Sequence, residues 1–256
     1  MIYVTGDIHA RPDFADEVIC NLDDGAILFC TGEWGYGFFD RYCNEEKFYD
    51  YIAKKNIIVL IVEGNHENFA RLGKLPVSYW NGGRVHKIRD NIMHCLRGEV
   101  FTVEDKTIFT FGGGYSLNRE SLTEGIDWWP EENISESDRL NGDANLSAHD
   151  NKVDFCLSHT APLNTVAALA YRYWGDIRLA VPEEFEITNY LQHVAEKTHY
   201  PKWYFSHFHR DVDNLKDNQI ALMYHVRNLE TGEIVYTRKR IHDSTCDTVM
   251  LRDEWV

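Results

Sequence analysis

Five short apolar runs along the chain each end abruptly at polar residues that include histidine or a carboxylate. Each run is rich in β-branched or aromatic residues, as is typical of a strand buried in a sheet. The runs are Ile2–Val4, Ala26–Cys30, Ile57–Val62, Val153–Leu157 and Trp203–Phe205. Between the first three runs lie two helix-like stretches: Pro12–Leu22 has Pro near its start and acids in its first turn, and Phe38–Lys54 has apolar residues at helical spacing. This alternation of strand and helix predicts a parallel sheet with right-handed crossovers.

The middle of the chain changes character and indicates antiparallel pairing. Short strand-like runs separated by turn signals occupy Val85–Ile88, Ile92–Leu96, Val100–Val103 and Thr107–Phe111. We expect helices over Ser135–Ala148, Ala161–Tyr171 and Glu184–Lys197, and a hairpin of Ile220–Arg227 with Ile234–Arg238. The sequence contains no linker-like stretch, so residues 1–256 are interpreted as a single α/β domain with two packed sheets.

Composition and charge narrow the class of protein. The 256 residues are 44% hydrophobic and carry a formal net charge of −15. This charge argues against tight nonspecific binding to nucleic acid, which depends on Lys and Arg contacts with phosphates. A phosphorylated substrate stays open, because bound metals can invert the local charge of a site.

The sequence also predicts the cellular compartment of the protein. Its six cysteines are scattered without a CxxC pair, so we expect no disulfide framework. They are Cys20, Cys30, Cys43, Cys95, Cys156 and Cys246. No run approaches the roughly 20 apolar residues of a membrane helix, and the first residues do not resemble a signal peptide. We therefore expect a reduced, cytoplasmic protein with no membrane partner.

Metal-competent side chains follow all five apolar runs. Ligands of open α/β sheets bind beyond the carboxyl ends of the strands. That edge would collect Asp7, His9, Glu33, Asn65, His66, His159, His207 and His209. Imidazole with carboxylate or amide oxygen suits zinc, manganese, iron or nickel. Alternate residues of an extended chain point the same way, so Asp7 with His9, and likewise the last two histidines, can face one site. The set predicts two divalent metal ions, with Glu33 as the natural bridge.

These motifs resemble those of the calcineurin-like metallophosphoesterases. The resemblance is carried by Gly6-Asp7-Ile8-His9, Gly64-Asn65-His66-Glu67, His159 and Ser206-His207-Phe208-His209, in that order. It spans residues 5–209 and implies an α/β fold, namely a four-layer α-β-β-α sandwich of two mixed β-sheets flanked by helices. It also implies a role for each matching residue. Asp7, His9 and His209 would hold one metal, and Asn65, His159 and His207 the other. Glu33 would bridge them, and His66 would be the catalytic residue that contacts the substrate phosphate or protonates the leaving oxygen.

The second motif departs from the family pattern. It reads Gly32-Glu33-Trp34-Gly35-Tyr36, where the family usually has Gly-Asp-x-x-Asp. Glu33 keeps a carboxylate on a side chain that is one methylene longer. Tyr36 replaces the second Asp, which would orient His66 in the protein-phosphatase branch. The sequence therefore disfavours a close relationship with protein Ser/Thr phosphatases.

A later segment resembles a subgroup of small bacterial and phage-like family members. It comprises Gly112–Ser116, Arg119 and Trp128–Glu132. The sequence leaves two roles open for Arg119: a contact with substrate phosphate or a surface ion pair. The two tryptophans are open between a wall over the site and core packing.

Two functional hypotheses follow. The first is a metal-dependent phosphoric ester hydrolase that cleaves a phosphomonoester or phosphodiester by attack of a metal-bound hydroxide at a dinuclear site. Its substrate would be a phosphorylated small molecule, a nucleotide or a phosphoprotein. The alternative, motivated by Glu33, is a catalytically weak metal-binding scaffold of the same fold.

Overall fold

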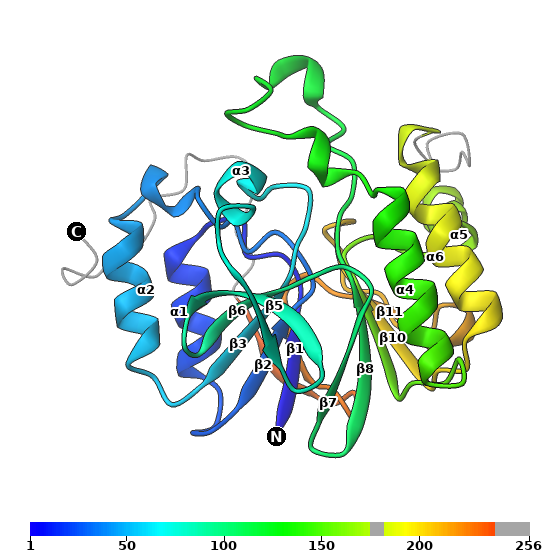
Figure 1. Cartoon of the computed structure of the whole chain (residues 1–256), viewed down its shortest axis with the longest axis horizontal. Coiled ribbons are helices and arrows are strands. Elements are labelled where there is room, and N and C mark those ends of the chain that lie inside the picture. The colour runs from blue at the N-terminus through cyan, green and yellow to red at the C-terminus, as the bar shows by residue number, and fades with distance from the viewer. Residues whose placement is uncertain (175–181, 239–256) are drawn as a thin grey trace.

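Two β-sheets lie face to face in the computed structural model, which describes residues 1–174 and 182–238 (Figure 1). In spatial order, the larger sheet contains β13 (Ile234–Thr237), β12 (His225–Asn228), β1 (Ile2–Thr5), β2 (Ile27–Cys30), β3 (Ile58–Val62), β6 (Ile92–Cys95), β5 (Gly83–Arg89) and β4 (Val77–Trp80). The smaller sheet contains β11 (Gln219–Ala221), β10 (Lys202–Phe205), β9 (Phe155–Ser158), β8 (Lys106–Phe111) and β7 (Glu99–Val103). His242 and Cys246 lie outside the described residues.

Parallel strands form the centre of each sheet. Strands β1, β2, β3 and β6 pair in parallel in the larger sheet, and β8, β9, β10 and β11 do so in the smaller one. The carboxyl ends of these strands therefore point the same way within each sheet, and the loops that follow them meet between the two halves of the molecule (Figure 1). This convergence brings the predicted ligands together.

Helices cover the outer face of both sheets. The larger sheet is covered by α1 (Pro12–Cys20) and α2 (Glu45–Ala53), with the short α3 (Phe69–Leu72) near its upper edge (Figure 1). The smaller sheet is covered by α4 (Glu136–Ala148), α5 (Leu163–Trp174) and α6 (Phe185–Lys197). No helix among the described residues is long and apolar enough to cross a membrane. The predicted four-layer sandwich is confirmed.

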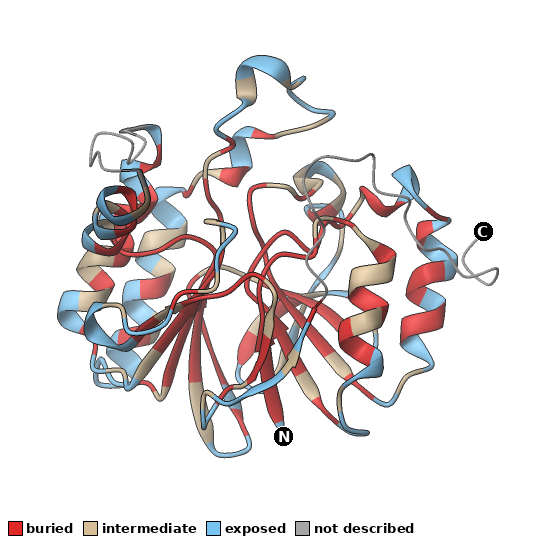
Figure 2. Cartoon of the chain, turned by 180° about the vertical axis from the view of Figure 1, so that it is seen from behind, coloured by how far each residue is buried: buried red, intermediate tan, exposed pale blue. Residues whose placement is uncertain are grey.

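Three apolar layers hold the sandwich together. Leu28, Phe48 and Ile52 belong to the layer between the larger sheet and its helices. The layer between the sheets includes Val4 and Leu157, and a third layer lies under α4, α5 and α6. Buried residues accordingly follow the strands and the inner faces of the helices (Figure 2). Because strands in the middle are covered on both faces, they appear in the sequence as continuous apolar runs.

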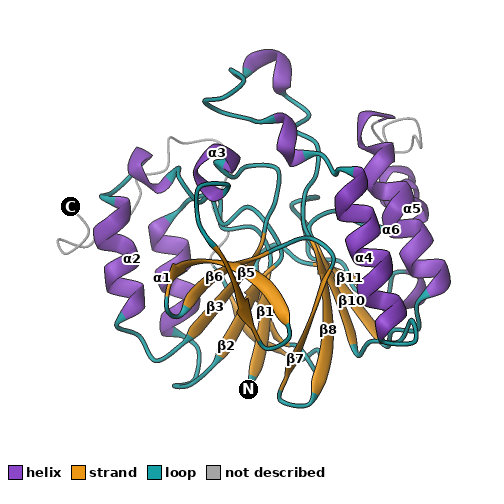
Figure 3. Ribbon diagram, viewed as in Figure 1, coloured by secondary structure: helices purple, strands orange, loops and turns teal. Residues whose placement is uncertain are grey.

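Local signals explain where the helices begin. Ser135 caps α4 in a capping box with Asp138, as a Ser followed by an acid three residues later favours. The helix predicted over Phe38–Lys54 is shorter in the structure, because Asn44 caps α2 by accepting from the backbone of Lys47. The residues before Asn44 form a separate 3-10 turn over Phe39–Arg41 (Figure 3).

Strand pairing corrects two predictions. The run Ile220–Arg227 is not one strand: it divides into β11 in the smaller sheet and β12 in the larger sheet. The predicted hairpin survives only between β12 and β13. Strand β6 pairs antiparallel with β5 but parallel with β3, so the middle of the chain is not purely antiparallel. Apolar runs predict strands but not their partners, because pairing depends on packing of the whole fold.

Candidate metal centre

The loops after β1, β2, β9 and β10 bring the predicted ligands into two groups. Position 1 is defined by Asp7, His9, Glu33 and His209, and position 2 by Glu33, His159 and His207, together with Asn65 after β3. Within each group, the His and carboxylate ligand atoms lie within 4.8 Å of one another. Asn65 joins position 2 because its Oδ1 lies 2.9 Å from Nε2 of His159. Glu33 belongs to both positions.

Backbone hydrogen bonds place Glu33 beside the first motif. Its carbonyl accepts the N–H groups of Ile8 at 3.1 Å and His9 at 2.6 Å. The carboxylate of Glu33 then lies with Oε2 only 2.5 Å from Nδ1 of His9, while Oε1 lies 3.8 Å from Nε2 of His159. One carboxylate oxygen thus faces each position, as a bridging ligand requires.

Position 2 is compact. Nε2 of His159 lies 3.0 Å from Nδ1 of His207 and 2.9 Å from Oδ1 of Asn65. Donor atoms bound to one divalent ion at about 2.1 Å are separated by about 3 Å when they are neighbours around it. The three side chains therefore present their donor atoms at a spacing that suits a shared cation.

Several predicted ligands sit on strained backbone. Positive φ angles occur at His9 (56°), Glu33 (44°), His207 (70°) and His209 (49°). Residues other than glycine adopt this region at a cost of order 1–3 kcal/mol, and such residues cluster at functional sites. The chain is therefore not extended at His9, His207 or His209, and the alternate-residue geometry expected for these two motifs is not what places their side chains in one site.

Gly32 allows the loops to approach one another. Its φ is +139°, and an added Cβ would stand 1.8 Å from Nδ1 of His159. Any side chain at this position would displace that ring, so the glycine beside Glu33 is required by packing as well as by backbone conformation.

Buried oxygen atoms without partners test whether cations fit here. Oδ1 of Asp7 is buried and receives no hydrogen bond from any described residue, and the buried Oε2 of Glu33 lies against Nδ1 of His9, 2.5 Å away. Unpaired buried carboxylate oxygens are costly in a folded protein. Divalent cations would satisfy them, and the mixed imidazole, carboxylate and amide donors suit transition metals. The residues present therefore fit a pair of divalent ions.

Protonation within the metal-free protein supports the same view. Burial lowers the pKa of His9, but the Glu33 carboxylate outweighs burial and raises it to about 9. The pKa of His207 is likewise raised to about 9, against burial, by Glu184. Burial together with His207 lowers the pKa of His159 to about 4. Protons on His9 and His207 balance the negative charge of the neighbouring carboxylates, and metal binding would displace these protons.

A comparison with protein families decides the class. A model of the calcineurin-like phosphoesterases matches residues 1–211, most of the chain. The chain belongs to the calcineurin-like phosphoesterase family. Metal-dependent hydrolysis of phosphate esters is the general activity of that family, and the matched residues contain every predicted ligand. A comparison with curated proteins found no match.

Outer partners hold the predicted position 2 ligands of this calcineurin-like family member. The ring of His159 contacts the carbonyl of Thr31 through Nδ1 at 3.1 Å, which leaves Nε2 for the site. The amide nitrogen of Asn65 donates to Oγ of Ser116 at 3.1 Å, so its oxygen faces His159. Ser116 in turn donates to the buried Glu132 at 2.8 Å. Such outer partners set the tautomer and orientation of metal ligands.

Arg119 is engaged away from the centre. Its Nε donates to the same Glu132 at 2.8 Å, and its guanidinium lies between the rings of Tyr115 and Trp128, at 3.9 and 4.2 Å from their centroids. The structure thus shows an ion pair with a buried carboxylate and not the expected surface ion pair, and contact with substrate phosphate stays a prediction. Trp129 is buried against Phe38, with ring centroids 5.8 Å apart, so it packs in the core.

His66 lies at the mouth of the centre. Its side chain is 35% exposed, and its Nε2 lies 3.9 Å from Oε1 of Glu33. Tyr36, which stands where the family usually has an Asp, does not take over as its partner: the Tyr36 ring packs against the guanidinium of Arg71 at 5.1 Å. The backbone N–H of Tyr36 is instead held by the buried carboxylate of Glu67 at 2.5 Å.

The structure adds two residues that sequence reasoning did not find. Arg238 is buried beneath the first motif, where it donates to the carbonyl of Asp7 at 2.7 Å and to that of Met223. Glu184 approaches position 2 from the start of α6. Neither residue stands in a motif or after one of the ligand-bearing strands, so no local signal marks them.

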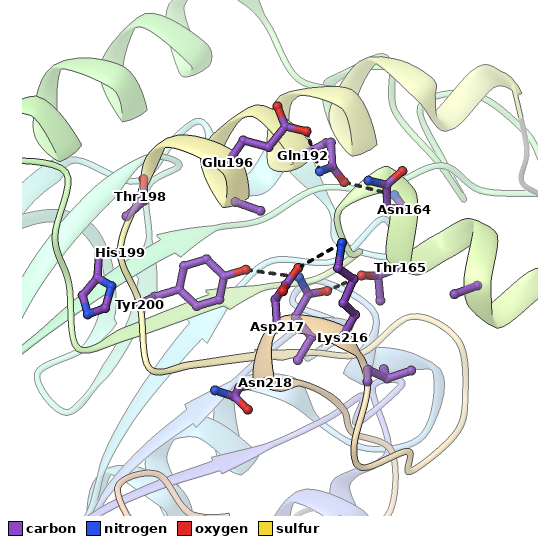
Figure 4. A pocket seen from close by; sticks show the side chains of 14 residues that line it. Asn164, Thr165, Gln192, Glu196, Thr198, His199, Tyr200, Lys216, Asp217 and Asn218 are labelled. Atoms are coloured by element: carbon purple, nitrogen blue, oxygen red, sulfur yellow. Dashed lines mark hydrogen bonds and ion pairs between the residues drawn. The ribbon is translucent and has the colours of Figure 1, made fainter.

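Two cavities differ in the side chains that line them. The one over the metal centre has a volume of about 370 Å³ and is lined by Glu33, Asn65, His66, Tyr115, Leu117, Asn118, Val166, Glu184, His207, Phe208 and His209. A larger cavity of about 490 Å³ lies between α5, α6 and the turn at Lys216–Asn218 (Figure 4). Polar side chains there pair with one another, for example Gln219 with Thr165 and Tyr200. The cavity of about 370 Å³, which the predicted ligands line, is therefore the candidate active site.

Proposed function

We propose that this protein hydrolyses a phosphomonoester or phosphodiester at a dinuclear metal site. The observation that supports it most strongly is the placement of Glu33. Its two carboxylate oxygens face the two groups of ligands, at 2.5 Å from His9 and 3.8 Å from His159. A single carboxylate between two complete sets of donors favours a bridged pair of ions over an isolated one.

The residues divide the work between the two positions. Asp7, His9 and His209 would hold one ion, and Asn65, His159 and His207 the other, with Glu33 shared. Held by these residues, divalent ions would supply Lewis acidity toward a phosphoryl oxygen and lower the pKa of water bound to them. The surrounding protein keeps the donor atoms fixed, so little reorganisation accompanies the reaction.

His66 is suited to act on the departing group. Its ring is partly exposed at the mouth of the centre and lines the same cavity as the ligands. A histidine there can donate a proton to the leaving oxygen or a hydrogen bond to a phosphoryl oxygen. Its Nε2 lies 3.9 Å from Oε1 of Glu33, so the ring stands beside the carboxylate proposed to bridge the two positions.

The part of the substrate that enters the candidate metal centre would be small. The cavity of about 370 Å³ is lined by Leu117, Val166 and Phe208 as well as by the predicted ligands. These side chains suit an apolar portion of the leaving group, while the phosphate meets the metal ligands. A phosphorylated small molecule, a nucleotide or the side chain of a phosphoprotein each meets this description.

The test uses purified protein stripped of metal and then supplied with Mn²⁺. We expect turnover of para-nitrophenyl phosphate or of the corresponding bis ester, which separates monoesterase from diesterase activity. His66→Gln should lower kcat by about 10²–10⁴-fold, the range for loss of a general acid, without changing Mn²⁺ binding. No turnover of either ester with any divalent metal, in protein shown to be folded, would overturn the proposal.

A scaffold without catalysis is the second candidate, and one observation favours it. Glu33 replaces the shorter carboxylate usual in the family, and its Oε2 is already in close contact with His9. A scaffold would bind Mn²⁺ but leave both esters intact. The same assay, run beside a Mn²⁺ titration, therefore separates the two functions.

A further inference from the structure

Glu184 brings a buried carboxylate to the metal centre from outside the set of predicted ligands. It ends the 3-10 turn Pro182–Glu184, immediately before α6, and is 3% exposed. Its Oε1 lies 3.0 Å from Nε2 of His207 and accepts no other well-aligned hydrogen bond from any described residue. It is therefore a buried acceptor that stands beside one ring nitrogen of His207.

The two ring nitrogens of His207 face different groups. Nδ1 lies 3.0 Å from Nε2 of His159, on the side of position 2. Nε2 lies on the side of Glu184. An imidazole nitrogen binds a metal only through its lone pair, so the proton of the neutral ring must reside on the other nitrogen. For His207 to serve position 2 through Nδ1, its proton must be on Nε2.

Glu184 is itself held in place. The backbone of Tyr115, in the loop after β8, hydrogen-bonds to its carboxylate. At the other end, the hydroxyl of Thr188 donates to its carbonyl at 3.0 Å. The carboxylate is thus fixed between the loop after β8 and the start of α6, and its position does not depend on His207.

We propose that Glu184 is a positioning residue, which accepts the Nε2–H of His207 and so presents Nδ1 as a lone-pair donor to position 2. This inference rests on the proposed metal centre. Carboxylates in this relation to a ligating histidine fix its tautomer and raise its basicity, and their loss costs about 10–100-fold in metal affinity. Position 2 gains its third oriented ligand in this way, beside His159 on Thr31 and Asn65 on Ser116.

The experiment compares metal binding by four full-length proteins. Wild type, Glu184→Ala, Glu184→Gln and Glu183→Gln are stripped of metal and titrated with Mn²⁺ by calorimetry. We expect wild type to bind two ions, and Glu184→Ala to weaken one class of site by about 10–100-fold while the other is unchanged. Glu184→Gln keeps an acceptor oxygen and should recover part of the loss. Glu183 is exposed, so Glu183→Gln should match wild type.

A second readout follows the proton directly. In ¹⁵N-labelled protein loaded with diamagnetic Zn²⁺, the Nε2–H of His207 should give a downfield resonance in wild type and in Glu184→Gln. The resonance should be lost to solvent exchange in Glu184→Ala. A purely structural role for Glu184 would lower the melting temperature without this selective change.

Two results would overturn the proposal. One is a Glu184→Ala protein whose two Mn²⁺ sites keep wild-type affinity. The other is equal weakening of both sites together with loss of thermal stability, which would make Glu184 a general support of the fold. Wild type that binds no Mn²⁺ would overturn the metal centre itself and this inference with it, so the two failures are distinguishable.

Discussion

The two halves of the metal centre differ in burial and in support. The side chains of His159 and His207 at position 2 are 0% and 9% exposed, whereas those of His9 and His209 at position 1 are 30% and 57% exposed. Each His or Asn ligand of position 2 contacts a residue behind it. Within the described residues, the ring nitrogens of His9 and His209 meet only Asp7 and Glu33, carboxylates of the ligand set itself.

This difference indicates which half of the candidate metal centre would be organised before a metal ion binds. Position 2 is set by packing and outer hydrogen bonds, so few side chains must be ordered when a cation enters. Position 1 lies nearer to solvent, and its two rings have more freedom. We therefore expect position 2 to hold its ion more tightly and position 1 to exchange its ion faster.

The largest expected loss of metal affinity follows a substitution at Glu33, the predicted ligand that both positions share. Glu33→Gln keeps the size of the side chain but removes its charge, so affinity for Mn²⁺ should fall at both positions, by more than about 100-fold. Glu33→Asp keeps the charge and is the matched control. Calorimetry measures both sites. A Glu33→Gln protein that loses only one site would show that this carboxylate does not bridge.

The next effect separates the halves. His159→Ala should abolish Mn²⁺ binding at the tight site and lower kcat/KM more than His209→Ala does, because His159 contacts both Asn65 and His207. His209→Ala should affect the weaker site. Equal losses in the two variants, each shown to be folded by circular dichroism, would contradict the ranking of the two positions.

A smaller effect tests the outer support of position 2 alone. Ser116→Ala removes the acceptor that fixes the amide of Asn65, so affinity at the tight site should fall by about 10-fold, with position 1 unchanged. Ser121→Ala is the matched control, since Ser121 is an exposed serine that bonds only within its own turn, to Asn118. If both serine variants bind Mn²⁺ as wild type does, the amide needs no such support.

The smallest expected effect is on the pH dependence of the free energy of unfolding, through the pair of histidines beside Glu63. Burial and the stacked ring of His94 lower the pKa of His86 to about 4, and His94 contacts Glu63, which precedes the Asn65 loop. An unfolded histidine titrates near 6.5. The unfolded chain therefore takes up protons first, and the free energy of unfolding should decrease as pH falls from about 6.5 to about 4. It should be unaffected by His86 above that range.

Urea denaturation at pH 7 and pH 5 measures this share of the stability. His86→Gln removes the titrating group, so its stability should fall less than that of wild type over the same interval. A wild type and a variant that lose the same stability between the two pH values would exclude this contribution.

The ligand motifs and the strands that precede them could be predicted from the sequence, because each depends on residues that are close together along the chain. The ligands of positions 1 and 2 come directly after apolar runs, and parallel strands carry their carboxyl ends to a common edge. The outer partners could not be predicted in this way. Ser116 stands in a segment that the sequence marks but whose contact with Asn65 it does not reveal, and Glu184 resembles an ordinary helix-start residue. Each is separated along the chain from the side chain that it supports, so only the folded chain shows the contact.

By itself, the sequence determined the strand-and-helix alternation, the order of the motifs and the residues offered to metal. Those features follow from hydrophobic periodicity and from residue type. Only the tertiary structure decided that Ile220–Arg227 divides between two sheets, that Arg119 binds Glu132, and that Glu184 contacts His207. Each of these depends on which distant elements pack side by side. The unequal support of the two metal positions therefore became visible only in the folded chain.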